Sequence, residues 1–299
     1  MTVIAFLGIG AMGEPMARRC IEAGLTVKLW NRSPAKLSAL AAMGGAMAAT
    51  PKLAAEGAEI ICLCLSDAAA VEAVVFGRCG VTGSATEGAL IVDFSSISPA
   101  ETRRMAEQVK RNHGLRWIDC PVSGGVRGAS GGTLTVLAGG SSADVAAATA
   151  VLEAVAARVT HMGETGAGQA AKLANQLIVS TTLLAIAEAL ALAERLGIDP
   201  SAIPEALRGG FADSAPLQIF GPRMAAARDP GPPVSALATM MKDIEMVLAA
   251  AHASGVDLPL IERVAARYGA IIADGRGGED LPVLMRLYRG PADKEPSND

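Results

Sequence analysis

The chain has 299 residues, of which 51% are hydrophobic and only 3% aromatic, and 33 are glycines. That length accommodates two domains with substantial cores, and the high apolar content excludes a disordered chain. The formal net charge is −4. Because the sequence has no basic stripe with interleaved aromatic residues, nucleic acid is not an expected partner.

The first residues, MTVIAFLGIGAMG, lack the positive charge that begins a signal peptide and run into a glycine motif, so we interpret them as a strand. Apolar runs then alternate with helical stretches, which predicts an α/β domain over residues 1–162. Its sheet is expected to be doubly wound and mainly parallel, with helices on both faces. The expected strands are 3–7, 27–30, 60–65, 90–94, 115–120 and 133–138. The expected helices are 15–23, 34–43, 68–75, 99–112 and 142–156.

From about residue 163 the strand signals disappear, which predicts an all-helical domain over residues 163–299. Its expected helices are 166–196, 201–207, 235–253 and 259–272. Five prolines are expected to break up the middle of the second half of the chain: Pro216, Pro222, Pro230, Pro232 and Pro233. The polar tail PADKEPSND is expected to fray. The apolar run 173–192 contains several polar side chains, so we expect a buried helix and no membrane span.

The cysteines and histidines show no metal-ligand spacing, and no metal is expected. The cysteines read as buried thiols in a reducing cytoplasm. They are Cys20, Cys62, Cys64, Cys79 and Cys120. The three histidines are widely separated in sequence.

A glycine motif follows the first expected strand and precedes the first expected helix. In G-x-G-x-x-G, the first glycine permits a tight turn, the second lets the backbone approach a pyrophosphate, and the third lets helix and strand pack closely. The helix start offers N–H groups to the phosphates. A glycine-rich turn without a ligand is the alternative. The predicted dinucleotide-binding residues are Gly8, Ile9, Gly10, Ala11, Met12 and Gly13.

The end of the second expected strand indicates which dinucleotide binds. Asn31, Arg32 and Ser33 stand where an NAD enzyme usually has an acidic residue for the ribose hydroxyls. Arg32 can pair with a 2′-phosphate, and its neighbours can add hydrogen bonds. We therefore expect NADP (NADPH) to be preferred over NAD; alternatively, Arg32 stacks on adenine or points into solvent.

Two further motifs are candidates for the substrate site. Consecutive amides at Ser123, Gly124 and Gly125 could form a nest for a carboxylate, although a flexible turn is the plain alternative. Lys172 shares one helix face with Asn175 and Gln176, because they are three and four residues apart. A lone lysine is usually a solvated charge. Near a buried helix start, however, desolvation and the helix dipole both disfavour its ammonium form, which suits a proton donor and acceptor.

Taken together, these motifs resemble the β-hydroxyacid dehydrogenase family, which is 6-phosphogluconate dehydrogenase-like. The family includes 3-hydroxyisobutyrate dehydrogenases, 2-hydroxy-3-oxopropionate (tartronate semialdehyde) reductases and succinic semialdehyde/glyoxylate reductases. The resemblance covers nearly the whole chain. It is carried by GIGAMGEPMARRC, DFSSISP, DCPVSGGVRGASGGTL, GAGQAAKLANQ and MMKDIEMVLAAAHASGVDLPL.

The resemblance implies a Rossmann domain, an all-α C-terminal domain joined through a long helix, and an active site in the cleft between them. It also implies that Lys172 is the catalytic acid/base and that Ser123 and Gly124 bind the substrate carboxylate. Further residues are implied to lie along the cofactor: Leu65, Ser66, Ser96 and Lys242. Many family members have Asn at the position of Gln176, so either Asn175 or Gln176 is expected to contact substrate. The K-x-A-N-Q form is similar to the 2-hydroxy-3-oxopropionate reductase group.

The expected function is hydride transfer between NADP and a small anionic β-hydroxy acid or semialdehyde, by a cytoplasmic homodimer or homotetramer. The alternatives within the family are 3-hydroxyisobutyrate dehydrogenase and succinic semialdehyde/glyoxylate reductase. An imine reductase would use the same architecture but generally lacks this lysine. A non-catalytic NADP-binding module is the alternative from another class.

Overall fold

The computed structural model describes residues 2–226 and 235–289. The polar tail that we expected to fray therefore lies outside the described residues. The chain divides into two compact units between Lys172 and Leu173, and each is described by itself.

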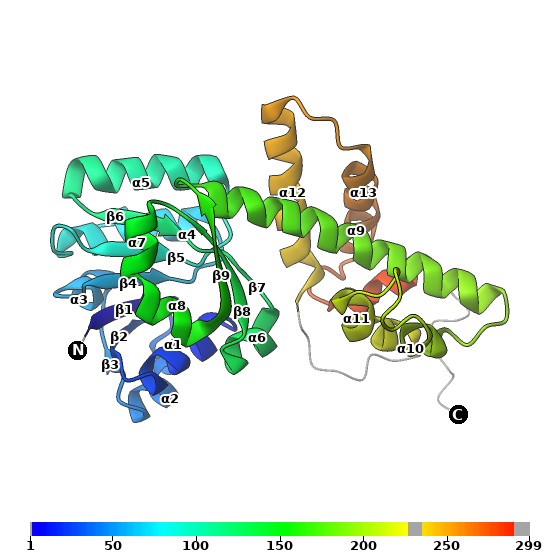
Figure 1. The fold of residues 1–299 in the computed structure, drawn as a ribbon, viewed down its shortest axis with the longest axis horizontal. Helices are drawn as coiled ribbons and strands as arrows, with labels where there is room; N and C mark the ends of the chain where they lie inside the picture. Colours follow the sequence, from blue (N-terminus) through cyan, green and yellow to red (C-terminus); the bar gives the residue numbers. More distant parts are fainter. Residues whose placement is uncertain (1, 227–234, 290–299) are drawn as a thin grey trace. The chain divides into compact units, whose positions relative to one another are not determined.

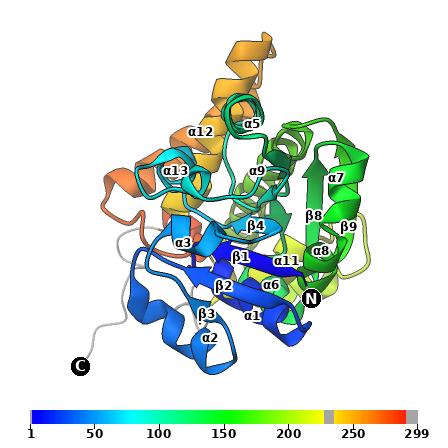
Figure 2. The same ribbon diagram turned by 90° about the vertical axis from the view of Figure 1, so that its left-hand side faces the viewer.

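The first unit is built on one sheet with the strand order β3-β2-β1-β4-β5-β6-β8-β7, and β9 pairs with β8. Figure 1 shows the run from β6 down to β3, and Figure 2 shows β8 and β9 beside α7 and α8. The strands are β1 (Val3–Leu7), β2 (Thr26–Trp30), β3 (Ala46–Met47), β4 (Ile60–Leu63), β5 (Leu90–Asp93), β6 (Arg116–Asp119), β7 (Val122–Ser123), β8 (Leu134–Gly139) and β9 (Ala156–Gly163).

The pairing confirms a mainly parallel sheet. Strands β3 to β6 pair in parallel, whereas β8 is antiparallel to β6 and β7 and parallel to β9. Strands β3, β7 and β9 were not predicted from the sequence. The first two contain only two residues each. Strand β9 is mostly exposed, and Arg158, Thr160 and His161 interrupt its apolar residues, so none of the three forms an apolar run.

Helices cover both faces of the sheet. They are α1 (Gly13–Glu22), α2 (Ser38–Ala42), α3 (Pro51–Ala55), α4 (Ala68–Phe76), α5 (Pro99–His113), α6 (Gly125–Gly131), α7 (Ser142–Ala147) and α8 (Thr149–Val155), with the 3-10 helices η1 (Pro34–Leu37) and η2 (Val81–Gly83). In β1, Ile4 and Phe6 join one core while Ala5 and Leu7 join the other, because successive side chains of a strand point to opposite faces. The expected helix 142–156 is interrupted, since α7 and α8 are separate and Ala156 begins β9.

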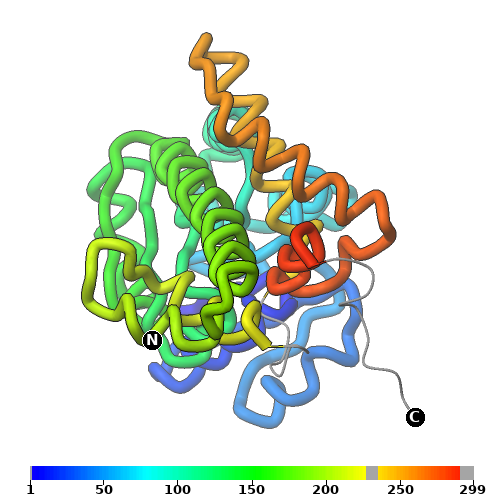
Figure 3. Tube along the Cα trace, turned by 90° about the vertical axis from the view of Figure 1, so that its right-hand side faces the viewer, coloured from blue at the N-terminus to red at the C-terminus, as the bar shows by residue number. Residues whose placement is uncertain are grey.

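The described part of the second unit is helical. Its elements are α9 (Ala167–Arg195, which begins in the first unit), η3 (Pro200–Ala202), α10 (Ile203–Ala206), α11 (Ala215–Ala225), α12 (Leu237–Ser254), α13 (Pro259–Ala273) and η4 (Leu281–Leu287). The orange tube in Figure 3 follows α12 and α13, which pack on each other. Their core surrounds Tyr268, which is fully buried and donates its hydroxyl to Ser180 O at 3.2 Å. The fold class predicted from the sequence is confirmed.

Helix α11 corrects one prediction. Of the five prolines expected to break up this region, Pro216 and Pro222 lie in α11. The other three lie outside the described residues: Pro230, Pro232 and Pro233. Pro216 is in the first turn, where the amide that proline lacks would have no intrahelical partner. Pro222 lies inside the helix, where the packing of Leu217, Phe220 and Met224 in the core outweighs its unfavourable propensity.

Among the described residues, α9 alone is long and apolar enough to cross a membrane by length and composition. The core helix of a soluble protein passes the same test, and 44% of the apolar window of α9 is buried. Leu183 and Leu190 on its inner side belong to the core of the second unit. These contacts agree with the expected buried helix.

Candidate functional site

The glycine motif forms the connection between β1 and α1, and its three glycines differ in what surrounds them. Gly8 has φ +101°, and a Cβ there would lie 2.3 Å from Cys64 O; at Gly13 a Cβ would lie 1.9 Å from Gly8 O. At Gly10 a Cβ would meet nothing within 4 Å. The first and third glycines are thus required by packing. The second leaves open space over the backbone, as an approaching pyrophosphate needs.

Asn31, Arg32 and Ser33 follow β2 beside this motif. The Asn31 side chain accepts a hydrogen bond from Ile9 N at 3.0 Å and donates to Ser33 O at 3.1 Å. Asn31 therefore ties the glycine motif to the end of β2. Arg32 and Ser33 are exposed.

Leu65, Ser66 and Ser96 follow β4 and β5, adjacent strands of the sheet. Leu65 N donates to Ser95 Oγ at 3.0 Å, which joins the two loops. Ser66 is exposed and its hydroxyl bonds Asp67, the residue that caps α4. These loops leave the carboxyl ends of parallel strands, where ligands of open α/β sheets bind.

The predicted carboxylate loop connects β7 to α6. Gly124 and Gly125 have φ +127° and +61°, a region that favours glycine. They turn the chain directly from Ser123 into α6. The first amides of a helix have no intrahelical acceptor, so amide donors at this turn are left without an acceptor in the helix.

Lys172 is held next to that loop. Its Nζ donates a hydrogen bond to Val122 O at 2.9 Å, and the side chain is half-buried. Val122 immediately precedes Ser123. The structure thus brings together two predictions that lie about fifty positions apart in the sequence.

A buried polar network holds the start of α9, and the sequence analysis gave its members no role. Asp119 Oδ1 accepts from Gly166 N at 2.7 Å, and its Oδ2 accepts from Gln169 N at 2.8 Å. The Gln169 amide donates to Ser95 O at 2.7 Å and accepts from Ile97 N at 3.4 Å. Asp119 and Gln169 are 0% and 1% exposed. Asp119 belongs to the DCPVSGG motif and Gln169 to the GAGQAAK motif, and this membership was the available signal.

Asp93, at the end of β5, is the second fully buried carboxyl group here. Its Oδ1 accepts from Ser95 N at 2.9 Å. Burial raises its pKa from 3.8 to about 7, although the hydrogen bonds from Ser95 oppose the rise. Asp93 therefore changes charge near neutral pH.

The remaining predicted residues lie in the second unit. Gln176 is 7% exposed; its amide donates to Asp243, and its Oε1 accepts from Asn175 Nδ2 at 2.8 Å. Lys242 Nζ lies 3.4 Å from Asp243 Oδ1. Both ends of the Gln176 amide are used inside this unit, whereas Asn175 is more exposed.

The cysteine prediction needs one correction. Cys20, Cys62 and Cys120 are buried and Cys64 is half-buried, but Cys79 is exposed after α4. Burial raises the pKa of Cys64 to about 12, so this thiol next to the glycine motif stays protonated. Among residues 2–226 and 235–289, no group of His, Cys, Asp or Glu could hold a metal ion.

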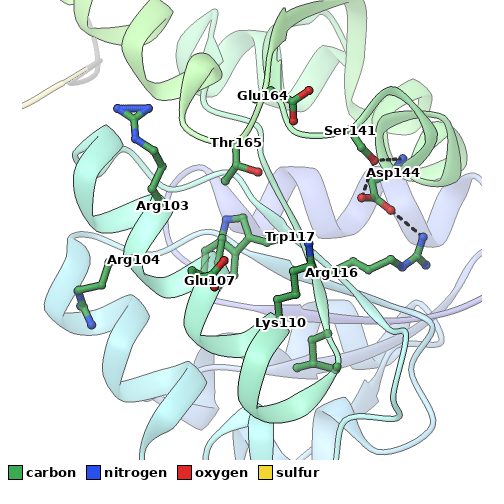
Figure 4. A pocket seen from close by; sticks show the side chains of 13 residues that line it. Arg103, Arg104, Glu107, Lys110, Arg116, Trp117, Ser141, Asp144, Glu164 and Thr165 are labelled. Carbon is green, nitrogen blue, oxygen red and sulfur yellow. Dashed lines mark hydrogen bonds and ion pairs between the residues drawn. The ribbon is translucent and has the colours of Figure 1, made fainter.

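A groove of about 760 Å³ on the first unit is separate from these residues (Figure 4). It is lined from α5, β6 and α7, and contains none of the predicted site residues. Two of its cations are paired, Arg104 with Glu72 at 2.9 Å and Arg116 with Asp144 at 2.8 Å. Its mixed charge does not indicate an anion site.

The sheet, the glycine motif and the adjoining loops are those of a dinucleotide-binding domain. The family model described as "NAD binding domain of 6-phosphogluconate dehydrogenase" matches residues 3–163. The one described as "NAD-binding of NADP-dependent 3-hydroxyisobutyrate dehydrogenase" matches residues 166–288.

Two relatives are similar over almost their whole length. The chain is 35% identical to a 2-hydroxy-3-oxopropionate reductase of Escherichia coli, with 95% of this chain and 96% of that protein covered. It is 33% identical to a 3-hydroxyisobutyrate dehydrogenase of Pseudomonas aeruginosa, with 97% and 99% covered. The solved structure of a Mycobacterium tuberculosis 3-hydroxyisobutyrate dehydrogenase with L-serine has a TM-score of 0.86 and 31% identity, with 97% and 100% covered. This chain belongs to the β-hydroxyacid dehydrogenase family.

Proposed function

We propose that this protein is an NADP-dependent reductase or dehydrogenase of a short β-hydroxy acid or its semialdehyde, with 2-hydroxy-3-oxopropionate as the first candidate substrate. The observation that carries the proposal is the 2.9 Å hydrogen bond from Lys172 Nζ to Val122 O, beside the Ser123–Gly125 turn. It holds a proton donor next to a loop of anion-binding amides. The similarity to a 2-hydroxy-3-oxopropionate reductase supports the choice of substrate.

The cofactor fits the glycine motif, because a Cβ at Gly10 would stand in otherwise open space. The motif amides and the start of α1 would hold the pyrophosphate, and Leu65, Ser66 and Ser96 would line the remainder. A bound nicotinamide supplies or accepts the hydride.

Lys172 does the proton chemistry in this proposal. During reduction it donates a proton from Nζ to the forming alkoxide, and during oxidation the neutral amine removes the hydroxyl proton. Its charge also stabilises the alkoxide as negative charge develops. The turn at Ser123–Gly125 binds the substrate carboxylate and so fixes the carbonyl relative to the lysine.

Asn175 is the better candidate for substrate contact. Gln176 is buried and both ends of its amide are bonded to protein groups. Asn175 uses its amide nitrogen on Gln176, an arrangement that orients the Asn175 carbonyl for a substrate hydroxyl.

Arg32 is proposed to select NADP over NAD. Its exposed guanidinium, next to the Asn31 side chain that ties down the glycine motif, can make charge-assisted hydrogen bonds with a 2′-phosphate. Arg32→Ala should raise the KM for NADPH at least about tenfold and leave the KM for NADH nearly unchanged. Equal losses with both cofactors would contradict this role.

A homodimer or homotetramer is proposed from the exposed face of α9. Ile178 and Leu192 are 63% and 61% exposed, and they lie fourteen residues apart on one helical stripe with the exposed Ala185 between them. Ile178→Glu combined with Leu192→Glu should reduce the mass measured by light scattering. An unchanged oligomer would remove this face from consideration.

Imine reduction is the second candidate function. A Streptomyces aurantiacus imine reductase has a TM-score of 0.65 and 25% identity to this chain, with 97% of this chain covered. Lys172 beside the anion-binding turn favours the hydroxy acid reaction. Turnover of a cyclic imine faster than of any C2–C5 semialdehyde would reverse the preference.

The deciding experiment replaces the lysine. Lys172→Ala should lower kcat with 2-hydroxy-3-oxopropionate by about 10²-fold or more, while the Kd for NADPH stays within about twofold. Lys110→Ala, at an exposed position on α5, is the matched control and should behave as wild type. Wild-type turnover by Lys172→Ala would overturn the proposal.

A further inference from the structure

The carboxylate of Asp119 occupies the meeting point of three segments. It ends β6, and it accepts the amide protons of Gly166 and Gln169 at the beginning of α9. A Cβ at Gly139, the last residue of β8, would lie 2.6 Å from Asp119 Oδ1, and a Cβ at Gly168 would lie 2.8 Å from Oδ2. The carboxylate is thus enclosed by backbone and is 0% exposed.

This arrangement explains the glycines of the GAGQAAK motif. Gly166 adopts φ +89° while it donates to the carboxylate. A Cβ at Gly168 would lie 2.3 Å from Leu137 O and 2.7 Å from Asp119 O. Only glycine at these two positions lets the helix start come this close to the sheet.

The same loop that holds the first turn of α9 also receives the lysine. Lys172 lies six positions after Gly166, which is about 9 Å along a helix. Val122 lies three positions after Asp119, which is about 10 Å along an extended chain. Asp119 contacts Gly166, and Val122 contacts Lys172. The distance between the two contacts is therefore about the same along the β6–β7 connection as along the start of α9.

We propose that Asp119 is a positioning residue, which sets the register of α9 against the β6–β7 connection and thereby places the Lys172 amine. This inference rests on the proposed role of Lys172. Charged hydrogen bonds to backbone amides are stronger than neutral ones, and the positive end of the helix dipole favours an anion there. Gln169, through Ser95 and Ile97, holds the same turn against the loop after β5.

The test compares two buried carboxylates that both accept backbone amides. Asp119→Asn keeps the shape but loses the charge and one acceptor. Asp280→Asn is the matched control, because Asp280 accepts Ser235 N and Leu281 N at 2.9 Å each at the start of η4 in the second unit. For each variant, kcat is calculated from the concentration of protein that binds NADPH, so that misfolded molecules do not lower it. KM, the Kd for NADPH and Tm are also measured.

We expect Asp119→Asn to lower kcat at least about tenfold, since small misplacements of reacting groups cost that much or more. KM and the Kd for NADPH should stay within about threefold. Asp280→Asn should lower Tm and leave kcat unchanged. In the Lys172→Ala background, adding Asp119→Asn should cause no further loss, because both changes act through one amine.

If Asp119→Asn had the kcat of wild type while Lys172→Ala was inactive, this inference would be overturned and the proposed function would stand. Wild-type kcat for Lys172→Ala would instead overturn the proposed function. A second measurement does not depend on the variant folding. In wild-type protein the Gly166 and Gln169 amides should exchange with deuterium at least about 10²-fold more slowly than unprotected amides, and unprotected exchange would equally overturn the proposed anchor.

Discussion

Two glycines of the same motif should respond in opposite ways to the same substitution. Gly13→Ala would put a methyl group 1.9 Å from Gly8 O, whereas Gly10→Ala would put one where nothing lies within 4 Å. The first change forces α1 away from β1 by more than an ångström. The second leaves the protein packing as it is and fills the space over the backbone that the pyrophosphate needs.

The magnitudes follow from these distances. Overpacking costs about 1–3 kcal/mol in adaptable cores. Gly13 faces backbone, which adapts least, so we expect at least about 3 kcal/mol. At roughly 2–4 °C per kcal/mol for a protein of this size, Tm should fall by about 6 °C or more. Gly10 has no positive φ, so alanine there should change the free energy of unfolding by less than about 1 kcal/mol.

The assay pairs chemical denaturation with NADPH fluorescence titration. Gly10→Ala should weaken the Kd for NADPH at least about tenfold, or 1.4 kcal/mol, in a protein of normal stability. If Gly10→Ala binds NADPH as tightly as wild type, the motif does not approach the pyrophosphate as argued. If Gly13→Ala unfolds like wild type, the packing argument is wrong.

Three further predictions concern buried polar groups. Burial raises the pKa of Asp93 to about 7, so the folded form retains a proton that the unfolded form has already released, and stability should fall as pH rises. The free energy of unfolding should fall by about 2–3 kcal/mol between pH 5 and 8. Urea titrations at several pH values should show no such fall for Asp93→Asn. The same pH dependence in wild type and variant would exclude Asp93 as its source. Asp280→Ala removes the partner of Arg223, which lies 2.7 Å away with its side chain 11% exposed, and should cost about 3–5 kcal/mol. Arg208→Ala, which breaks an exposed pair with Glu205, should leave Tm unchanged. If Asp280→Ala and Arg208→Ala lowered Tm equally, burial would not decide the strength of these ion pairs. Gln176→Ala should lower Tm because Asp243 loses a hydrogen-bond donor. Asn175→Ala should mainly raise the KM for substrate. If Gln176→Ala raised KM and Asn175→Ala lowered Tm, the two residues would have the opposite roles.

Elements were predictable from the sequence where buried side chains follow one another in a regular apolar pattern. Strands such as β4 and β5 are buried on both faces and read as apolar runs. Within the described part of the chain, strand β9 pairs only with β8, and it is largely exposed, so no apolar pattern marks it. Helix α11 was hidden because Pro222 lies inside it.

The candidate site was predicted only in part, for a related reason. Motif spacing identified Lys172 and the Ser123–Gly125 turn, because each is a local pattern. The bonds of Asp119 and Gln169 that hold them together join residues about 50 to 74 positions apart. Nothing in the composition of either segment specifies the other as its partner.

The boundary between the two units suggests where related enzymes can be recombined. The division falls directly after Lys172, so the helix turn that carries the amine belongs to the dinucleotide-binding unit. Its contacts with Asp119, Ser95 and Ile97 lie in the same unit. A chimera joined at Leu173 would exchange Asn175, Gln176 and Lys242 together, while the proposed proton donor Lys172 and its anchors would come from one parent. Substrate preference could then diversify in a protein whose proposed acid/base residue is inherited intact.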